Sequence, residues 1–440
     1  MSKVITRFPP SPTGYLHIGS VRTALFNYLF AEHNKGHMVF RFEDTDAERG
    51  KKEFEDDIIN GMQWLGLALD QNPPRQSERT ELYKQHLARL IEQGNAYEAE
   101  ESEATPGMKV VRFKNPNTKI TFHDAVRGEV TFDTTELGDF VIARTHDLPL
   151  YHLAVVIDDA DMHVTHVIRG EDHLSNTQRQ ILLIEALGFL RPEYAHIPLI
   201  LAADRSKMSK RHGAVSVSEY KAQGFIPEAI LNYLALLGWN PGGEQELFTL
   251  SELIELFTLD RVHKAGAIFD IEKLKWFNHE HLKKLSDVEF TTRLREFIEN
   301  HGEKPPEYLV DVAPIIKISA QTLGEAAESL RLGNFSFMED SIVVDPLLLA
   351  QGAKADAETI KHNLKITFDL IAKAPDEAFT ADVVKEAVFP YATEVGRAAV
   401  LWPMRVALSG KEKSPDPFTL ASLIGKTKTL SRIEAALTLL

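Results

Sequence analysis

The most informative absence in this 440-residue sequence is cysteine, which does not occur. Without thiols the chain forms no disulfide and offers no thiolate to a metal, so disulfide-rich scaffolds and cysteine-ligated zinc sites are excluded. Long uninterrupted apolar segments are missing too, since MSKVITRFPP has no signal-peptide core and Glu185 breaks the apolar stretch from Ile181 to Leu190. We therefore expect a cytoplasmic protein without a membrane span.

Positive charge is also scarce, with 49 lysines and arginines against 64 acidic residues and a net charge of −15. Because phosphate contacts dominate binding to nucleic acids, any RNA-binding face must be a local basic patch on an acidic body. The length and an apolar content of 44% otherwise fit a globular protein of roughly two to four domains. The candidate patches are Arg205–His212, Lys273–Lys284 with Trp276 among the lysines, and Lys426–Arg432.

A strand, a turn and a helix follow one another at the N-terminus. Residues Val4–Phe8 alternate as in a strand, three prolines and Gly14 then force an irregular turn, and a helical pattern runs from Ile18 until Gly36. This order opens nucleotide-binding βαβ units, in which the free N–H groups of the helix bind phosphate. His17 could donate to a phosphate oxygen and Gly19 lets a ligand approach the backbone, although a His-x-Gly at a helix start is by itself more often structural.

A basic loop, Asp204–Gly213, follows a second apolar run, Ile197–Leu201, which indicates a buried strand. At the end of a parallel strand such a loop could fold over a triphosphate and neutralise the charge that grows on it. A solvated basic loop is the commoner fate of such a run. Ser216 and Glu219 then form a capping box that starts the next helix.

Five collinear blocks of this sequence resemble one enzyme family. HIG at 17–19 and KMSK at 207–210 resemble the two signature motifs of class I aminoacyl-tRNA synthetases. PSPTGYLHIG, RFEDTD at 41–46, YHLAVVIDD at 151–159, VIRGEDHLSNT at 167–177 and SKRHGA at 209–214 are similar to bacterial glutamyl-tRNA synthetases in particular. Because the blocks are collinear, the sequence is identified as a member of that family. The signature position after HIG is Ser20 rather than histidine, which removes one potential donor.

The resemblance implies ATP-dependent activation of L-glutamate and its transfer to the terminal adenosine of tRNA(Glu), with tRNA(Gln) as an open second substrate. It implies ATP with Mg²⁺, no membrane partner and a monomer. The residues implied in catalysis are His17, Gly19, Lys207 and Lys210. Those implied in ATP binding are His17, Gly19, Asp172, Ile200, Lys207, Met208, Ser209 and Lys210. Those implied in glutamate binding are Arg7, Ser11, Glu43, Tyr151 and Arg169.

Acidic residues follow the second predicted strand, Met38–Phe42. Ligands bind beyond the carboxyl ends of strands in open α/β sheets, so we assign Glu43 to the substrate ammonium, as the resemblance also implies. Asp44 and Asp46 are better interpreted as caps of the following helix.

Arg169 ends the apolar run Val164–Ile168, so its guanidinium should point into a cleft and need an anion. Together with Arg7 it can engage substrate carboxylate, although the residues do not show which arginine contacts which carboxylate. A site built for a buried anion leaves an arginine unpaired when neutral glutamine enters, which would reject glutamine by about 10⁴-fold.

The region between the two halves of the nucleotide fold is predicted to be an inserted β-rich lobe. Its strands are expected at Val110–Phe113, Ile120–His123, Val130–Asp133 and Phe140–Arg144. In the family this insertion grips the tRNA acceptor end and often carries a structural zinc. Here it is short and has no cysteine, so we expect no zinc and no other metal site.

Residues Tyr151–His173 are predicted to form a strand, a turn at Asp158–Asp161 and a second strand. A metal site formed by His163 and His166 with the nearby aspartates is the weaker interpretation, because residues three apart face opposite sides of a strand. The next helix is expected to be capped by Ser175 and ended by Gly188.

The predicted fold is an α/β Rossmann-like catalytic domain with a β-rich insertion, followed by an all-α C-terminal half. Pro227 is expected to open one helix, and residues 270–285 form another. The alternatives to a ligase are glutamylation of a modified tRNA base and a non-catalytic tRNA-binding paralogue. The predicted parts are 1–71 and 150–214 for the catalytic domain, 72–149 for the acceptor-end insertion, 215–302 for a stem-contact junction and 303–440 for anticodon binding.

Overall fold

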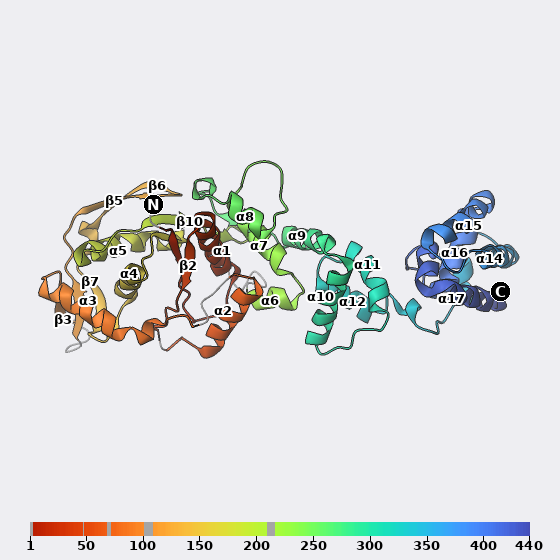
Figure 1. The fold of residues 1–440 in the computed structure, drawn as a ribbon, viewed down its shortest axis with the longest axis horizontal. Coiled ribbons are helices and arrows are strands. Elements are labelled where there is room, and N and C mark those ends of the chain that lie inside the picture. The colour runs from red at the N-terminus through yellow and green to blue at the C-terminus, as the bar shows by residue number, and fades with distance from the viewer. Residues whose placement is uncertain (1–2, 47, 68–71, 101–108, 209–215) are drawn as a thin grey trace. The chain divides into compact units, whose positions relative to one another are not determined.

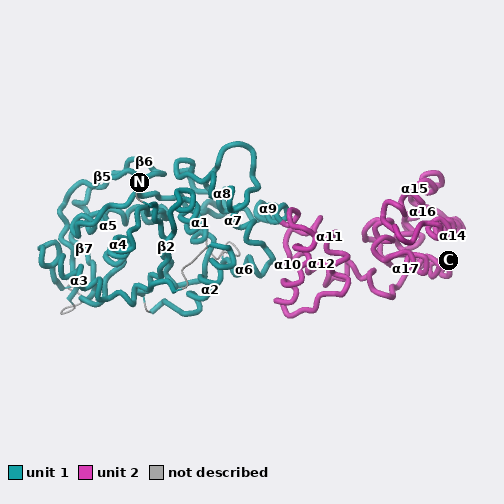
Figure 2. Tube along the Cα trace, viewed as in Figure 1, with its two compact units in different colours: residues 1–281 teal, residues 282–440 magenta. Residues whose placement is uncertain are grey.

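The structure is a computed structural model of the chain that describes residues 3–46, 48–67, 72–100, 109–208 and 216–440 (Figure 1). Two compact units, residues 1–281 and 282–440, are coloured separately in Figure 2. The first unit contains the α/β fold and the second is helical. This confirms the predicted fold class, while the finer division into five functional parts stays a prediction.

The predicted strand–turn–helix–strand opens the first unit. Strand β1 (Ile5–Phe8) pairs in parallel with β2 (His37–Phe40), and helix α1 (Ile18–His33) connects them. The return from α1 to β2 passes so close to β1 that a Cβ on Gly36 would lie 1.9 Å from the carbonyl oxygen of Val4. Only glycine fits there, so the residue that ends the predicted helical pattern is required by the packing of the return against β1.

The second half of the α/β fold joins the insertion through a shared sheet. Strand β9 (His166–Gly170) pairs in parallel with β10 (Glu193–Ile197), and β10 pairs in parallel with β5 (Lys119–Asp124) at Tyr194 and Asp124. With β6 (Gly128–Asp133) the strand order is β6-β5-β10-β9. The short strands β11 (Ile200–Leu201) and β12 (Ala267–Ile268) form a separate parallel pair.

The four predicted strands of the insertion all exist, but they do not form one lobe. Strands β4 (Lys109–Phe113) and β7 (Phe140–Thr145) form an antiparallel sheet with β3 (Ala96–Glu100) and β8 (Leu148–Pro149). The β5–β6 hairpin instead extends the catalytic sheet. Residues predicted to belong to the insertion therefore reach the neighbourhood of the cleft.

The predicted strand–turn–strand at residues 151–173 is wrong in its first half. Tyr151–Asp161 is helix α4, whose residues from Leu153 to Asp159 are all buried. A short continuous apolar run does not distinguish a buried strand from a buried helix, because neither shows a polar face. The second predicted strand corresponds to β9. The positive φ of 56° at His163 belongs to the turn after α4.

The helix after β9 also begins differently from the prediction. The 3₁₀ turn η3 (Glu171–His173) leads directly into α5 (Leu174–Leu187), so Ser175 lies inside the helix and caps nothing. Gly188 ends α5 in the left-handed conformation with a φ of 69°, as predicted.

The remaining helices of the first unit follow their sequence signals. Ser216 and Glu219 form the predicted capping box at α6 (Val217–Ala222), and Pro227 is the first residue of α7 (Pro227–Leu236). The helix predicted at 270–285 is α9, which runs past the boundary between the units. The other elements are α2 (Lys52–Trp64), η1 (Gln76–Glu78), α3 (Thr80–Glu92), η2 (Thr134–Leu137), α8 (Leu250–Leu256), η5 (Leu259–Arg261) and α9 (Ile271–Lys284).

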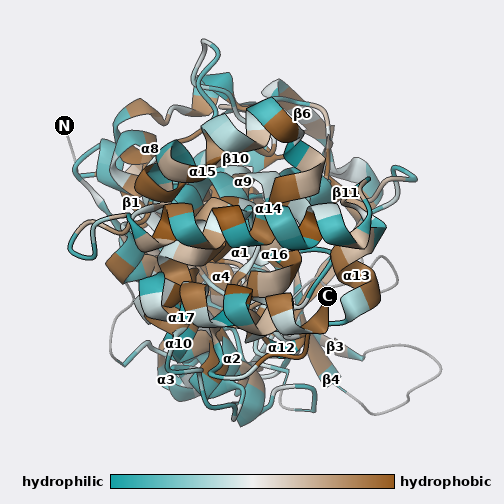
Figure 3. Ribbon diagram, turned by 90° about the vertical axis from the view of Figure 1, so that its right-hand side faces the viewer, coloured by the Kyte–Doolittle hydropathy of each residue, from teal (hydrophilic) through white to brown (hydrophobic). Residues whose placement is uncertain are grey.

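The second unit contains no strand within residues 282–440, all of which are described. Figure 3 shows hydrophilic and hydrophobic residues alternating along α14, as in an amphipathic helix. No helix in the described part of the chain is long and apolar enough to cross a membrane. The elements are α10 (Asp287–Asn300), α11 (Leu309–Ser319), α12 (Leu323–Arg331), η6 (Ser336–Met338), α13 (Pro346–Gln351), α14 (Ala357–Ala372), α15 (Ala381–Val395), α16 (Arg397–Ser409) and α17 (Pro417–Leu439).

One of the three basic patches predicted from sequence has a structural explanation within this unit. Arg432 is only 7% exposed and donates to the backbone carbonyls of Phe337, Leu408 and Glu339. Lys426 and Lys428 likewise donate to carbonyl oxygens. These cations tie α17 to its neighbours, which leaves less of their charge for a nucleic acid.

Candidate active site

One cleft of the first unit brings together the residues that the sequence singles out. It has a volume of about 700 Å³ and lies where β1, β2 and β9 end and α1 begins. Ser209 and Lys210 of the predicted set lie outside the described residues. The cleft is lined by every predicted site residue that the structure describes: Arg7, Ser11, His17, Gly19, Glu43, Tyr151, Arg169, Asp172, Ile200, Lys207 and Met208.

His17 is the N-cap of α1, with its imidazole at the mouth of the helix. Its Nδ1 accepts a hydrogen bond from the backbone N–H of Ser20 at 3.1 Å, so the neutral ring carries its proton on Nε2, which lies 3.0 Å from the hydroxyl of Ser20. Desolvation in the cleft and the charge of Lys207 lower the pKa of His17, which keeps the ring neutral. A Cβ on Gly19 would lie 3.0 Å from Nδ1 of His17, so glycine here leaves room for the imidazole.

The first residues of the basic loop are held beside the helix mouth. The ammonium of Lys207 lies 2.8 Å from the carboxylate of Asp172, and the backbone N–H of Met208 donates to the carbonyl of Ile200. These contacts join the loop to η3 and to β11. The described part of the loop therefore places one cation beside His17.

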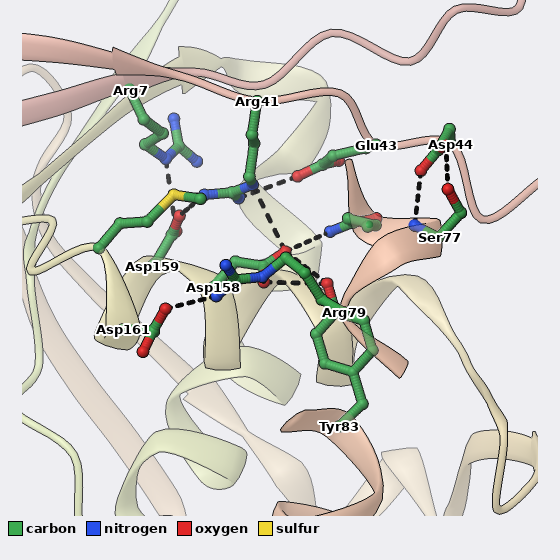
Figure 4. Close-up of polar contacts among 12 residues, drawn as sticks. Arg7, Arg41, Glu43, Asp44, Ser77, Arg79, Tyr83, Asp158, Asp159 and Asp161 are labelled. Carbon is green, nitrogen blue, oxygen red and sulfur yellow. Dashed lines mark hydrogen bonds and ion pairs between the residues drawn. The ribbon is translucent and has the colours of Figure 1, made fainter. Parts of the chain in front are cut away.

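Two residues of the cleft wall, Arg7 and Glu43, belong to a buried ion-pair network (Figure 4). Asp159, on α4, accepts from Nε of Arg7 at 3.3 Å and from Nη1 of Arg41 at 2.6 Å. Arg41 has no exposed surface and also donates from Nη2 to Glu43 at 3.0 Å. One carboxylate thus holds two arginines, and the second arginine holds Glu43.

This network sets the charge states of the acidic residues. Burial raises the pKa of Glu43 to about 7, and Arg41 opposes that rise only in part. Burial is also the largest influence on Asp159, but Arg41 and Arg7 together outweigh it and lower the pKa of this carboxyl. Asp159 is therefore ionised, whereas Glu43 titrates near neutral pH.

Asp158 connects the ion-pair network to η1 and α3. Its carboxylate accepts from Gln76 at 2.8 Å, Arg79 at 2.8 Å and Tyr83 at 2.9 Å, and it lies 3.6 Å from Nε of Arg41 (Figure 4). Asp158 and Asp159 are consecutive residues of α4, and both carboxylates belong to the same buried cluster of charges around Arg41. The aspartates that the sequence presented as a turn are consequently part of the site.

Arg169 is held differently from the other two arginines. It is 5% exposed, and it donates from Nη2 to the hydroxyl of Thr177 at 2.9 Å and from Nε to Nε2 of His196 at 3.1 Å. Its Nη1 is buried and has no hydrogen-bond partner among the described residues. A buried donor in a cleft wall that lacks an acceptor suits an anionic ligand. Tyr151 lies on the same wall, with its hydroxyl 3.1 Å from Nδ1 of His173.

Comparison with known proteins assigns the family. The catalytic-domain model of class I tRNA synthetases (E and Q) matches residues 3–105 and 98–276, and an anticodon-binding-domain model matches residues 289–437. A glutamate–tRNA ligase of Desulforamulus reducens is 38% identical over 98% of this chain and 99% of its own length. The chain belongs to the glutamate–tRNA ligase family. A relative of the same name from Oleidesulfovibrio alaskensis is 40% identical over 99% of both chains.

Solved structures of the family agree with this assignment. A glutamate tRNA ligase of Elizabethkingia meningosepticum in complex with its amino acid has a TM-score of 0.86 and 30% identity, and the match covers 99% of both chains. A glutamate-tRNA synthetase of Elizabethkingia anophelis has a TM-score of 0.84 and 30% identity, over 99% of this chain and 100% of its own. These structures support both the α/β fold and the helical half.

Two residues of the site were missed by the sequence analysis, Arg41 and Asp159. A signal for Arg41 existed, because it lies in the predicted strand Met38–Phe42 two residues before Glu43, and residues two apart in extended backbone share a face. The prediction that Asp44 and Asp46 cap the next helix is wrong, since Lys51 is the N-cap of α2. Asp44 instead accepts from the backbone N–H of Ser77. Asp46 pairs with the nearby Arg49 at 2.6 Å.

The described residues do not supply a ligand set for Mg²⁺. Glu43 and Asp172 are the acidic residues of the cleft wall, and they are engaged by Arg41 and Lys207, respectively. Outside the undescribed segments no group of three or more possible ligands is arranged to hold a metal ion. Mg²⁺ prefers oxygen ligands that include substrate phosphates, so an ion that arrives with ATP does not require a site built by the protein.

Proposed function

We propose that this protein activates L-glutamate with ATP to form glutamyl-adenylate and then transfers the glutamyl group to the terminal adenosine of tRNA(Glu). The observation that carries this proposal is the single cleft. It is lined by the N-terminus of α1 with His17 and Lys207, and also by the side chains of Arg169, Glu43 and Arg7. The first group is complementary to a triphosphate, and the second group is complementary to an acidic amino acid.

In the first step the substrate α-carboxylate attacks the α-phosphate of ATP, and the bond to pyrophosphate breaks. The chemistry is mainly positioning and charge stabilisation. Nε2–H of His17 and the free N–H groups of α1, where Gly19 leaves room, donate to phosphate oxygens. Lys207 and Lys210 neutralise charge on the phosphates, and Lys207 leaves Asp172 to do so. Ile200, Met208 and Ser209 border the nucleotide.

The amino acid is held by the other half of the cleft. Ionised Glu43 binds the ammonium group, and Arg169 with Tyr151 supplies donors to carboxylate oxygens. Arg7, already paired with Asp159, and Ser11 complete this end. In the second step a hydroxyl of the terminal adenosine attacks the carbonyl of the mixed anhydride, and AMP leaves.

The finer assignments belong to the same proposal. Residues 72–149 bind the acceptor end, 215–302 form the stem-contact junction, and 303–440 bind the anticodon as part of a cytoplasmic monomer. The match of an anticodon-binding model to residues 289–437 favours a ligase over an enzyme that glutamylates a tRNA base, because most such relatives lack this region. Whether tRNA(Gln) is a second substrate depends on anticodon contacts.

The proposal is tested with purified protein, ATP and Mg²⁺. Pyrophosphate exchange is measured with glutamate or glutamine, with and without tRNA, and charging is measured on purified tRNA(Glu) and tRNA(Gln). We expect glutamate-dependent exchange and charging of tRNA(Glu), and about 10⁴-fold lower kcat/KM with glutamine. A protein that charges neither tRNA with glutamate would contradict the proposal.

A further inference from the structure

A chain of buried polar side chains lies behind Arg169. Asp124 at the end of β5, His196 on β10 and Thr177 on α5 have no exposed surface, and they connect to Arg169 on β9. The carboxylate of Asp124 lies 2.6 Å from Nδ1 of His196, and Nε2 of His196 lies 3.1 Å from both Nε of Arg169 and the hydroxyl of Thr177. The imidazole therefore stands between a carboxylate and a guanidinium.

The contacts of Asp124 fix the tautomer of this histidine. Asp124 also accepts from the backbone N–H groups of His196, Val126 and Arg127 at 2.8–3.2 Å. Burial is the largest influence on its pKa, but the hydrogen bond with the His196 side chain and the backbone bonds from Arg127 and His196 outweigh it and lower the pKa. An ionised Asp124 accepts only, so Nδ1 of His196 must donate, and Nε2 becomes an acceptor when the ring is neutral. Burial lowers the pKa of His196, which favours the neutral ring.

The partners of Arg169 thus differ in charge from those of its neighbours. Arg7 and Arg41 both touch the carboxylate of Asp159. Arg169 touches a neutral imidazole and a hydroxyl, and its guanidinium lies 6.0 Å from the ring centre of Tyr194. Among the described residues no carboxylate forms an ion pair with it, and its Nη1 remains unpartnered. Arg169 accordingly keeps a positive charge that no contacting carboxylate balances among the described residues.

We propose that His196 is a positioning residue for substrate selectivity, because it fixes Arg169 through a neutral acceptor and so leaves the charge of that guanidinium for a substrate carboxylate. The inference rests on the proposed function. A carboxylate in the position of His196 would also orient Arg169, but it would neutralise the group that distinguishes an acid from an amide. Asp124 acts one residue further back, where it sets the tautomer of His196 without touching Arg169.

The test moves the carboxylate without changing the net charge. The double variant Asp124→Asn, His196→Glu removes the carboxylate from position 124, where it contacts His196. It places a carboxylate at position 196, where it contacts Arg169 directly. The matched control is Asp124→Asn, His196→Gln, which differs only in having an amide oxygen there. We compare kcat and KM for glutamate and for glutamine by pyrophosphate exchange.

We expect the ratio of kcat/KM for glutamate over glutamine to be about 10- to 100-fold lower in the double variant with His196→Glu than in the control with His196→Gln, the scale of one hydrogen bond to a charged group. The loss should lie in the KM for glutamate, with kcat at saturation similar in the two proteins, as for an interaction made equally in ground and transition states. Equal selectivity in the two variants would overturn the proposal, because a merely structural histidine would affect both alike.

If the first pair of variants does not fold, as judged by circular dichroism, a second pair of variants provides the test. Thr177→Asp and Thr177→Asn place a carboxylate or an amide on the other contact of Arg169, and the same difference in selectivity is expected. In the wild-type protein, ¹⁵N spectra of histidine should show His196 with an unprotonated Nε2. A ring protonated on Nε2 would overturn the proposal without any variant. Wild-type protein that does not activate glutamate would instead refute the proposed function.

Discussion

The charged side chains of the cleft differ in what already binds them. Arg7 and Arg41 share Asp159, Lys207 pairs with Asp172, and Arg169 has only neutral partners. A group whose charge is already balanced gains less from a ligand than one that is buried and unbalanced. At the scale of single residues, selectivity for an acid is therefore expected to depend on Arg169 more than on Arg7.

Glu43 leads to a prediction about pH. Burial raises its pKa to about 7, so below that pH it is protonated and cannot pair with the substrate ammonium. We expect the KM for glutamate to rise as pH falls, by about tenfold per pH unit below about pH 7. Steady-state exchange kinetics over about one and a half pH units on either side of this pKa would measure it. In Glu43→Gln the KM should be high throughout and lack this dependence; an unaltered profile in that variant would contradict the assignment.

The residues of the cleft lie at the ends of secondary-structure elements. The carboxyl ends of β1, β2 and β9 and the N-terminus of α1 meet at the cleft, and the basic loop starts from β11. Parallel strands put their carboxyl ends on one edge, which is why residues far apart in sequence converge there.

The basic loop should act on the transition state. We expect Lys207→Ala and Lys210→Ala each to lower kcat for pyrophosphate exchange by about 10²- to 10³-fold, as for one lost stabilising donor. Rapid kinetics with saturating ATP and glutamate would measure this loss. Asp172→Asn frees Lys207 without removing it and serves as the comparison. An unchanged exchange rate in both lysine variants would count against the role of the loop.

The turn between α1 and β2 should be intolerant of any side chain. A Cβ on Gly36 would lie 1.9 Å from the carbonyl oxygen of Val4, a backbone atom that cannot rotate away. We expect Gly36→Ala to lower the free energy of unfolding by about 3 kcal/mol or more, the upper range for overpacking. Urea denaturation would measure it. Gly14→Ala is the control, since a Cβ on Gly14 meets no atom within 4 Å and stability should change little.

At the scale of the whole molecule, the chain consists of two compact units. The catalytic-domain model matches residues of the first unit, and the anticodon-binding model matches residues of the second. Two compact units are expected to unfold in separate transitions, because multi-domain proteins violate two-state behaviour.

Arg432 provides the test of that independence. Its guanidinium satisfies three backbone carbonyls of the second unit, so Arg432→Met should lower the stability of this unit by about 1–3 kcal/mol for each buried acceptor left unpaired. Differential scanning calorimetry should show one transition shifted and the other unmoved, while Gly36→Ala should shift the opposite one. A common shift of both transitions in either variant would show that the units unfold together.

Local patterns were sufficient for much of this protein. The turn-forming prolines, the capping box at Ser216, Pro227 and Gly188 mark element ends through backbone restraints that act within a few residues, and these were predicted correctly. The strands of the insertion followed from alternation in the same way. The residues of the cleft were predicted by collinear motifs, and the fold brings the described ones together.

The tertiary structure alone decided the contacts that depend on what surrounds a segment. Residues 151–161 form a helix whose residues from Leu153 to Asp159 are all buried, so the apolar run has no polar face from which a helical period could be recognised. Asp159 contacts Arg7 because the fold brings α4 next to β1, which is distant from it in the sequence. His196 contacts Arg169 because β10 is the strand that pairs with β9. Sequence by itself determined which chemical groups the cleft contains; burial and cross-strand pairing determined which of their charges remain free for a ligand.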